Sequence, residues 1–177
     1  MPDALKTERE EIDETEFTTI EEAVDEALRE INDFRSAEGK ALEDELQQRA
    51  RNIQELLQKV MAMDPERIAG VRDRLQRGVA ELKENVDQNR FEQELIFYIE
   101  KFDITEEKVR LENHMDYFIK TLNSADSNGK KLGFISQEMG REINTIGSKS
   151  NYAPMQQLVV QMKDELEKIK EQLLNVL

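Results

Sequence analysis

Hydrophobic residues recur at three- and four-residue steps along almost the whole chain, which is the spacing of one face of an α-helix. The first stripe begins near Thr18 or Thr19, where a hydroxyl group can cap a helix. Its members are Ile20, Val24, Ala27, Ile31, Phe34, Leu42, Leu46, Ile53, Leu56, Leu57, Val60 and Met63. We expect this helix to end at Pro65, because the residue before a proline resists the α conformation. At about 1.5 Å per residue it would span about 65–70 Å, which favours a strut or one arm of a hairpin.

A second stripe predicts a helix that starts at Pro65 and ends within 82–85, followed by a turn at 86–87. We interpret residues 17–87 as a long helical hairpin arm. Residues 1–16 are dense in charge and poor in apolar groups, so we interpret them as an acidic tail or linker. The next apolar positions predict a further helix; they are Phe91, Leu95, Ile96, Phe97 and Ile99.

Residues 88–177 have the pattern of a compact helical domain. The polar segment 123–129 is its clearest loop, and a helix over 130–146 follows. A turn over 147–151 separates that helix from a final one, which starts near residue 153 and has a near-heptad apolar seam. No stretch shows the alternation of a β-strand, so the sequence predicts an all-α fold: a long helical hairpin arm plus a compact helical bundle.

The amino-acid composition is typical of a helical protein, and it excludes several kinds of functional site. Charged residues make up 36% of the chain and aromatic residues 6%, with seven glycines and three prolines. The absence of cysteine excludes disulfides, thiol nucleophiles and cysteine-based zinc sites. The acidic N-terminus is no signal peptide, and no apolar run approaches the roughly 20 residues of a membrane span. We therefore expect no membrane association.

The formal net charge of −14 argues against nucleic-acid binding by the surface as a whole. Residues 1–30 carry twelve acids and three bases, so this segment accounts for nine of the fourteen net negative charges. A cationic island interrupts the acidic background at 129–150, which reads GKKLGFISQEMGREINTIGSKS. Its cations are candidates for phosphate contacts, although ordinary surface bases would look the same; they are Lys130, Lys131, Arg141 and Lys149.

The island also contains two carboxylates one helical turn apart. Glu138 and Glu142 are spaced i, i+4, so both lie on one helix face. Such a pair can hold one divalent ion, or one member can act as a base. Salt bridges to Arg141 or Lys149 would explain the same spacing.

A second charged cluster precedes the island. The segment 103–106 reads as a capping box, in which Asp103 caps a helix and Glu106 is its reciprocal partner. Glu107 and Arg110 are free for other work, and they share a helix face with His114, the chain's one histidine. A lone histidine can be a metal ligand, a proton shuttle or a satisfied, partly buried side chain.

The island closely resembles the C-terminal signature of the YicC/YloC family of bacterial endoribonucleases. Further segments resemble that family in the same order along the chain; they are 34–39, 90–94, 101–111 with His114, and 162–172. The chain corresponds to the C-terminal half of the family plus the preceding linker. Several positions depart from the pattern. Gly133 stands where many relatives carry Asp, Tyr152 where an acid is usual and Lys170 where Arg is common, and the tail 173–177 is apolar rather than acidic.

The resemblance implies a cytoplasmic, divalent-metal-dependent endoribonuclease that forms ring-like hexamers around RNA. It implies phosphate contacts by the island cations and an Mg²⁺ or Mn²⁺ ion held by Glu107, Glu138 and Glu142. His114 or Arg110 would assist proton transfer or charge stabilisation beside the Glu138 and Glu142 pair. The alternative is a non-catalytic helical scaffold that oligomerises and presents RNA to another nuclease.

Overall fold

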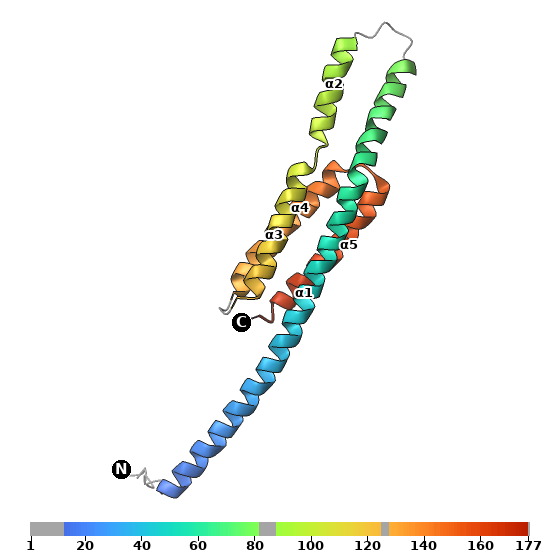
Figure 1. Cartoon of the computed structure of the whole chain (residues 1–177). Helices are drawn as coiled ribbons and strands as arrows, with labels where there is room; N and C mark the ends of the chain where they lie inside the picture. Colours follow the sequence, from blue (N-terminus) through green and yellow to red (C-terminus); the bar gives the residue numbers. More distant parts are fainter. Residues whose placement is uncertain (1–12, 82–87, 125–127, 177) are drawn as a thin grey trace, which may run out of the picture. The chain divides into compact units, whose positions relative to one another are not determined.

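The computed structural model describes residues 13–81, 88–124 and 128–176, and it confirms the all-α prediction. It contains five helices within these residues and no strand (Figure 1). The helices are α1 (Glu14–Glu81), α2 (Gln88–Lys101), α3 (Thr105–Leu122), α4 (Gly129–Lys149) and α5 (Ala153–Leu173). None of them combines the length and the apolar character that crossing a membrane would require.

The chain divides into two units, with the division at Ala41 and Leu42 inside α1. In the first unit, every described side chain is exposed, including the apolar stripe of α1. The second unit contains the rest of α1 and helices α2 to α5. It therefore draws on residues from both sides of the boundary at 87/88 that the sequence predicts.

The predicted helix end at Pro65 is wrong, because α1 continues through this residue to Glu81. A proline removes one backbone donor and leaves the carbonyl of the residue four positions earlier without its partner. Pro65 is exposed, so water can satisfy that carbonyl. Buried contacts flank the proline: Val60 belongs to the core, and Arg67 is held by ion pairing. These contacts stabilise the helical path more than the proline destabilises it.

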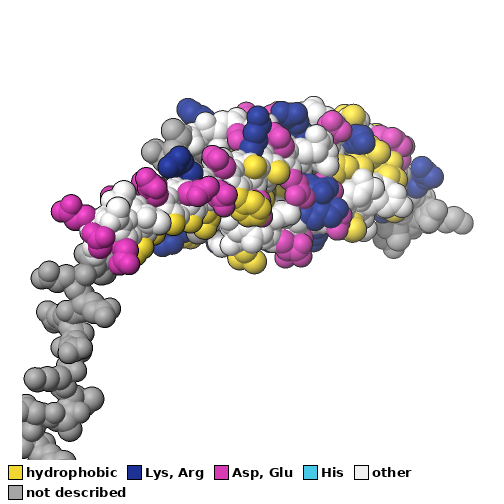
Figure 2. Space-filling model, turned by 90° about the horizontal axis from the view of Figure 1, so that it is seen from below, with side chains coloured by type: hydrophobic (Ala, Val, Ile, Leu, Met, Phe, Trp, Pro, Cys, Tyr) yellow, Lys and Arg dark blue, Asp and Glu magenta, His cyan; other side chains and the backbone are white. Residues whose placement is uncertain are grey.

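The hydrophobic core lies within the second unit and joins α1, α3, α4 and α5. Leu46, Leu57, Phe118, Met139 and Met162 are among its fully buried side chains. The apolar positions of α2 are less buried. Leu95 is buried there, whereas Ile96 and Phe97 are exposed, so only part of the predicted stripe of α2 is buried, and it lies outside the core cluster. On the face shown in Figure 2, acidic and basic side chains are interspersed with hydrophobic ones.

Two glycines bring α4 and α5 close together. A Cβ atom at Gly140 would lie 3.2 Å from Leu166 Cδ2, and one at Gly147 would lie 3.0 Å from Val159 Cγ1. Both contacts are too short for a larger side chain without displacement of its neighbour. Later residues of α4 therefore pair with earlier residues of α5, so the two helices are antiparallel.

The α2–α3 junction is held by hydrogen bonds to consecutive carbonyls. Arg67 donates to the carbonyl of Phe102 at 2.9 Å, and Lys149 donates to that of Asp103 at 3.0 Å. The Asp103 carboxylate accepts from the backbone N–H and the hydroxyl of Thr105. The predicted capping box is not formed, because Ile104 is the N-cap residue of α3 and makes no side-chain cap hydrogen bond. Asp103, one position earlier, accepts from Thr105, the first residue of the helix, and Glu106 pairs with Arg110.

The predicted boundaries of the later helices differ from the observed ones by a few residues. The predicted turn at 86–87 lies outside the described residues, as do residues 125–127 of the predicted loop. Helix α4 runs on to Lys149, so residues 147–149 of the predicted turn are helical. The start of the final helix at Ala153 is as predicted.

Candidate functional site

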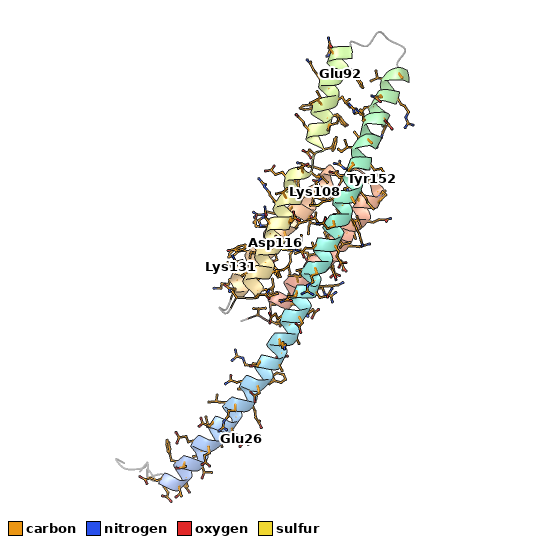
Figure 3. All side chains as sticks on the ribbon, viewed as in Figure 1. Glu26, Glu92, Lys108, Asp116, Lys131 and Tyr152 are labelled. Atoms are coloured by element: carbon orange, nitrogen blue, oxygen red, sulfur yellow. The ribbon has the colours of Figure 1, made fainter. Side chains whose placement is uncertain are left out.

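The predicted site residues of α3 and α4 face one another along one edge of an antiparallel helix pair. Lys149 contacts Glu107, Glu142 contacts Arg110, and Lys131 contacts Tyr117, so the pairing runs backwards along α4 as it advances along α3. We call this row of residues the α3–α4 ladder. Lys131 lies near one end of the hairpin, and Lys108 of α3 lies near the other (Figure 3).

The first rung of the ladder is a partly buried ion pair. Lys149 Nζ lies 2.7 Å from Glu107 Oε1. The Glu107 side chain is 8% exposed, and its other oxygen, Oε2, is buried without a hydrogen-bond partner in the described part of the chain. A buried carboxylate oxygen without a donor is costly, because it loses water and gains nothing in return. Glu107 Oε2 is therefore a position at which a bound group would be stabilised.

The second rung joins Arg110 to carboxylates on both sides. Arg110 lies 2.5 Å from exposed Glu106 on its own helix and 3.9 Å from Glu142 of α4. The Glu142 side chain is only 10% exposed. The Arg110 guanidinium is itself more than half exposed, so it can pair with Glu142 and still face solvent.

The last rung is a cation–π contact, in which Lys131 Nζ lies 4.9 Å from the centre of the Tyr117 ring. His114 lies on α3 between this rung and Arg110, and it is half-buried. It has no hydrogen-bond or ion-pair partner among the described residues. His114 is the one histidine of the ladder, and its imidazole is therefore available for proton transfer.

Three predicted site residues lie beside the ladder without bridging it. Glu138 and Arg141 form a pair within α4, at 2.7 Å, on a largely exposed surface. Lys130 is exposed in the first turn of α4. Glu138 thus has Arg141 as its partner, as the salt-bridge alternative expects, whereas Glu142 lies 3.9 Å from Arg110, a partner that this alternative did not include.

The acids predicted to bind a metal do not fit a three-ligand site in the described residues. The side-chain chemistry is suitable, since Mg²⁺ and Mn²⁺ prefer carboxylate oxygen. However, Glu107, Glu138 and Glu142 are each held by a different cation. The described ranges contain no group of three or more His, Cys, Asp or Glu residues that could hold a metal ion. Among the oxygens of these three acids, Glu107 Oε2 is the one that is buried without a hydrogen-bond partner in the described part of the chain.

A second set of charged residues, which the sequence-based prediction does not include, lies near the ladder's Lys149 end. Asp64 of α1 lies 2.7 Å from Arg67 and 2.6 Å from Lys108 of α3, and Asp64 and Arg67 are both buried. Arg74 of α1 lines a cavity together with Arg67 and Lys149. The signal was available: four arginines fall within residues 67–77 of a strongly acidic chain.

Comparison with known proteins identifies the family. A sequence model described as "Endoribonuclease YicC-like, C-terminal" matches residues 60–177. A protein of Clostridioides difficile named probable endoribonuclease YicC is 37% identical over 99% of this chain and 61% of its own length. One of Haemophilus influenzae with the same name is 34% identical over 87% of this chain and 54% of its own length.

The matched region contains α2 to α5 and the last part of α1, so it includes the entire α3–α4 ladder. The chain spans about 61% and 54% of the lengths of these two relatives in the aligned regions. The chain belongs to the YicC-like endoribonuclease family, and residues 60–177 correspond to the C-terminal region of that family.

Proposed function

We propose that this chain is the helical, RNA-binding part of an endoribonuclease and that the α3–α4 ladder contributes to cleavage of RNA phosphodiester bonds. The observation that best supports this proposal is the α3–α4 ladder. In it, Glu107, Arg110 and His114 of α3 lie opposite the island, which contains Glu142 and Lys149. The family to which the chain belongs, and the names of the two relatives, supply the reaction class.

Each residue has a role suited to its position. The exposed cations Lys130, Lys131 and Arg141 contact phosphates of the RNA. His114 transfers a proton, and Arg110 stabilises negative charge that develops on the phosphate. Lys149 is held by Glu107, so we assign it to positioning the end of α4 and to a partial phosphate contact.

Dependence on Mg²⁺ or Mn²⁺ is part of the proposal, but no step is assigned to the ion. In this arrangement the three predicted ligands are each paired with a cation. A metal site would require some of these pairs to open, or ligands from another segment or another subunit. When bound, such an ion would neutralise phosphate charge and activate water.

The first experiment measures cleavage of a labelled structured RNA by this chain and by a full-length relative, with Mg²⁺, Mn²⁺ or chelator. We expect metal-dependent cleavage, reduced at least about 100-fold by His114→Ala. Asn113→Ala is the matched control, because Asn113 is the exposed neighbour of His114 and lies outside the ladder. The proposal fails if His114→Ala and the double variant Glu138→Gln, Glu142→Gln both cleave at the parent rate.

A second candidate function is a non-catalytic scaffold that oligomerises and presents RNA to another nuclease. The stripe of α1 favours this function, because its large apolar side chains are exposed in the described chain; they are Phe17, Ile20, Val24, Leu28, Ile31 and Phe34. A scaffold would bind RNA in the presence of chelator, and the RNA would survive when metal was added. The cleavage experiment therefore distinguishes the two functions.

A further inference from the structure

A cavity of about 130 Å³ lies where α1 and α2 meet the end of α4. Three cations line it, and no acidic side chain does. The remaining polar and aromatic lining residues are Asn151, Tyr98 and Phe102. The absence of a lining acid is notable in a chain with 39 acids and 25 bases, because most concave surfaces of such a chain would carry negative charge.

The three cations of this cavity are not equivalent. Arg67 is bound by Asp64 and the carbonyl of Phe102, and Lys149 is bound by Glu107 and the carbonyl of Asp103. Arg74 has no ion-pair or hydrogen-bond partner in the part of the chain that the structure describes. Its charge is therefore the one available to an anion, with Lys149 and Asn151 beside it.

An aromatic surface adjoins the cations. The rings of Tyr98 and Phe102 contact one another, with centroids 5.0 Å apart, and Tyr98 is 43% exposed. Four of the ten Phe and Tyr residues of the chain fall within residues 91–102. Helix α2 thus presents a ring beside unpaired positive charge, which is the combination that binds single-stranded nucleic acid.

The cavity continues into neighbouring hollows on both sides. Leu75 and Tyr98 are shared with a mainly apolar hollow of about 320 Å³, which also has Arg90 and Glu94 in its lining. Arg67, Arg74 and Asn151 are shared with a polar hollow of about 290 Å³, where the acids Glu66 and Asp73 also lie. Together the three form a groove along the last turns of α1, with charge toward one end and rings toward the other.

We propose that this groove, here called the α1–α2 groove, binds a single-stranded segment of RNA. A phosphate lies against Arg74 and Lys149, and a base stacks on Tyr98. The cavity is too small for a whole drug-sized ligand, which needs about 300 Å³ or more, but it suits one phosphate or one ring of a longer strand. This inference rests on the proposed function and adds a binding subsite outside the island that the sequence singled out.

Lys149 connects the two sites. Its ammonium group lines the cavity and also forms the first rung of the α3–α4 ladder with Glu107. A strand bound in the α1–α2 groove would therefore pass the ladder at its Glu107 end. The groove would hold RNA next to the proposed chemistry without taking part in it.

The test is fluorescence anisotropy of this chain with a labelled twelve-nucleotide single-stranded RNA, in chelator and over a range of salt concentrations. We expect Arg74→Ala to weaken binding about fivefold to tenfold and to reduce the salt slope by about 0.7, the value for one lost phosphate contact on a single strand. Arg72→Ala is the matched control: it removes the same charge from an exposed position of α1 that does not line the cavity. It should change neither value.

Stacking is tested on Tyr98. Tyr98→Leu keeps an apolar side chain but removes the ring, and we expect about tenfold weaker binding with an unchanged salt slope. Tyr98→Phe should bind like the parent. Circular dichroism checks that each variant remains helical, and a duplex RNA of the same sequence should be insensitive to Tyr98→Leu.

The outcomes separate this inference from the proposed function. If the parent binds RNA but Arg74→Ala matches Arg72→Ala and Tyr98→Leu matches the parent, the α1–α2 groove is wrong while RNA binding stands. If the parent binds no RNA, both proposals are overturned. If His114→Ala abolishes cleavage while it binds RNA like the parent, binding and chemistry lie on different residues, as proposed.

Discussion

At the scale of single residues, charge pairing determines which side chains are available. Glu107 is almost fully buried, and its attachment to the end of α4 depends on Lys149. Removal of one partner of a buried pair leaves an uncompensated charge, which costs more than the pair itself contributes. The lysine is about one-third exposed, so water reduces this cost.

We predict that Lys149→Ala lowers the free energy of unfolding by about 1–3 kcal/mol, because Glu107 then stays buried without a cation. Urea denaturation measures this change. Lys163→Ala, at an exposed lysine of α5, is the control and should fall within about 0.5 kcal/mol of the parent. Glu107→Gln should rescue much of the loss in the Lys149→Ala background; equal and additive losses would show that the two residues do not interact.

A second residue-scale prediction concerns pH. Burial acts to raise the pKa of the Glu165 carboxyl, but hydrogen bonds from Asn52 and Lys168, together with Lys168 and Arg49 charge, outweigh burial and lower this pKa. A group whose pKa is lowered by folding stabilises the protein above its unfolded pKa, near 4.3 for Glu, and loses this contribution as pH falls through the folded value.

We therefore expect Glu165→Gln to be less stable than the parent by about 1 kcal/mol at pH 7. This gap should close between about pH 5 and pH 3, as the parent carboxylate becomes protonated. Urea denaturation at several pH values measures the gap. Glu171→Gln, at an exposed position of α5, is the control, and a gap of constant size over this range would contradict the assignment.

The structure brings together several of the residues that the sequence singles out, because Glu107 contacts Lys149 and Arg110 contacts Glu142. The sequence did not predict these pairs. It selected Glu107, Arg110, His114 and the island because their chemistry suits an RNA phosphate. It could not tell which carboxylates are paired, because pairing depends on the register between α3 and α4. The arginines of residues 67–77 stand out in the sequence, but the cavity that Arg74 lines forms only where α2 approaches α1.

At the scale of elements, the sequence predicted which regions are helical, but it predicted the ends of the helices less well. Periodicity identified the helical regions, because a stripe at three- and four-residue steps fits no other regular structure. The Pro65 prediction failed because local backbone preference was weighed without tertiary contacts. The pair of Asp64 with Lys108, which lies 44 positions later, and the local pair of Asp64 with Arg67 hold α1 through the proline.

Alanine substitution at two glycines of α4 should change stability in opposite directions, because only one of the two packs closely against α5. Alanine usually stabilises a helix over glycine by about 0.5–1 kcal/mol. A Cβ at Gly133 meets nothing within 4 Å, so Gly133→Ala should be stabilising by this amount. A Cβ at Gly147 would lie 3.0 Å from Val159 Cγ1, so Gly147→Ala should be destabilising by about 1 kcal/mol net. Thermal unfolding of both variants measures the difference, and stabilisation by both would contradict close packing at Gly147.

At the scale of the whole molecule, the described second unit has a core and the first unit has none. The exposed apolar residues of the first unit, from Phe17 to Phe34, recur with the heptad spacing of a coiled coil. A helix with such a stripe gains most of its stability from a packed partner rather than from its own backbone. The oligomer that the sequence predicts is therefore the simplest source of that partner.

We predict that this chain self-associates through a parallel pairing of the α1 stripe from two copies. In that register Glu30 of one copy lies opposite Arg35 of the other, which provides charge complementarity on both sides of the seam. Sedimentation equilibrium should show a dimer or larger species, reduced to monomer by Val24→Asp with Ile31→Asp. Val160→Asp, at an exposed apolar position of α5, controls for loss of hydrophobic surface and should leave the assembly intact.

Charge reversal tests the register of this pairing. Glu30→Arg alone and Arg35→Glu alone each place like charges opposite one another, so each should weaken association severalfold. The double variant Glu30→Arg, Arg35→Glu restores opposite charges and should regain the parent dissociation constant. Recovery in the double variant requires that these two residues face one another across copies. Additive weakening would mean that the stripe packs against a different surface. A parent that is monomeric at about 100 µM protein, where a weak dimer would form, would contradict self-association through this helix.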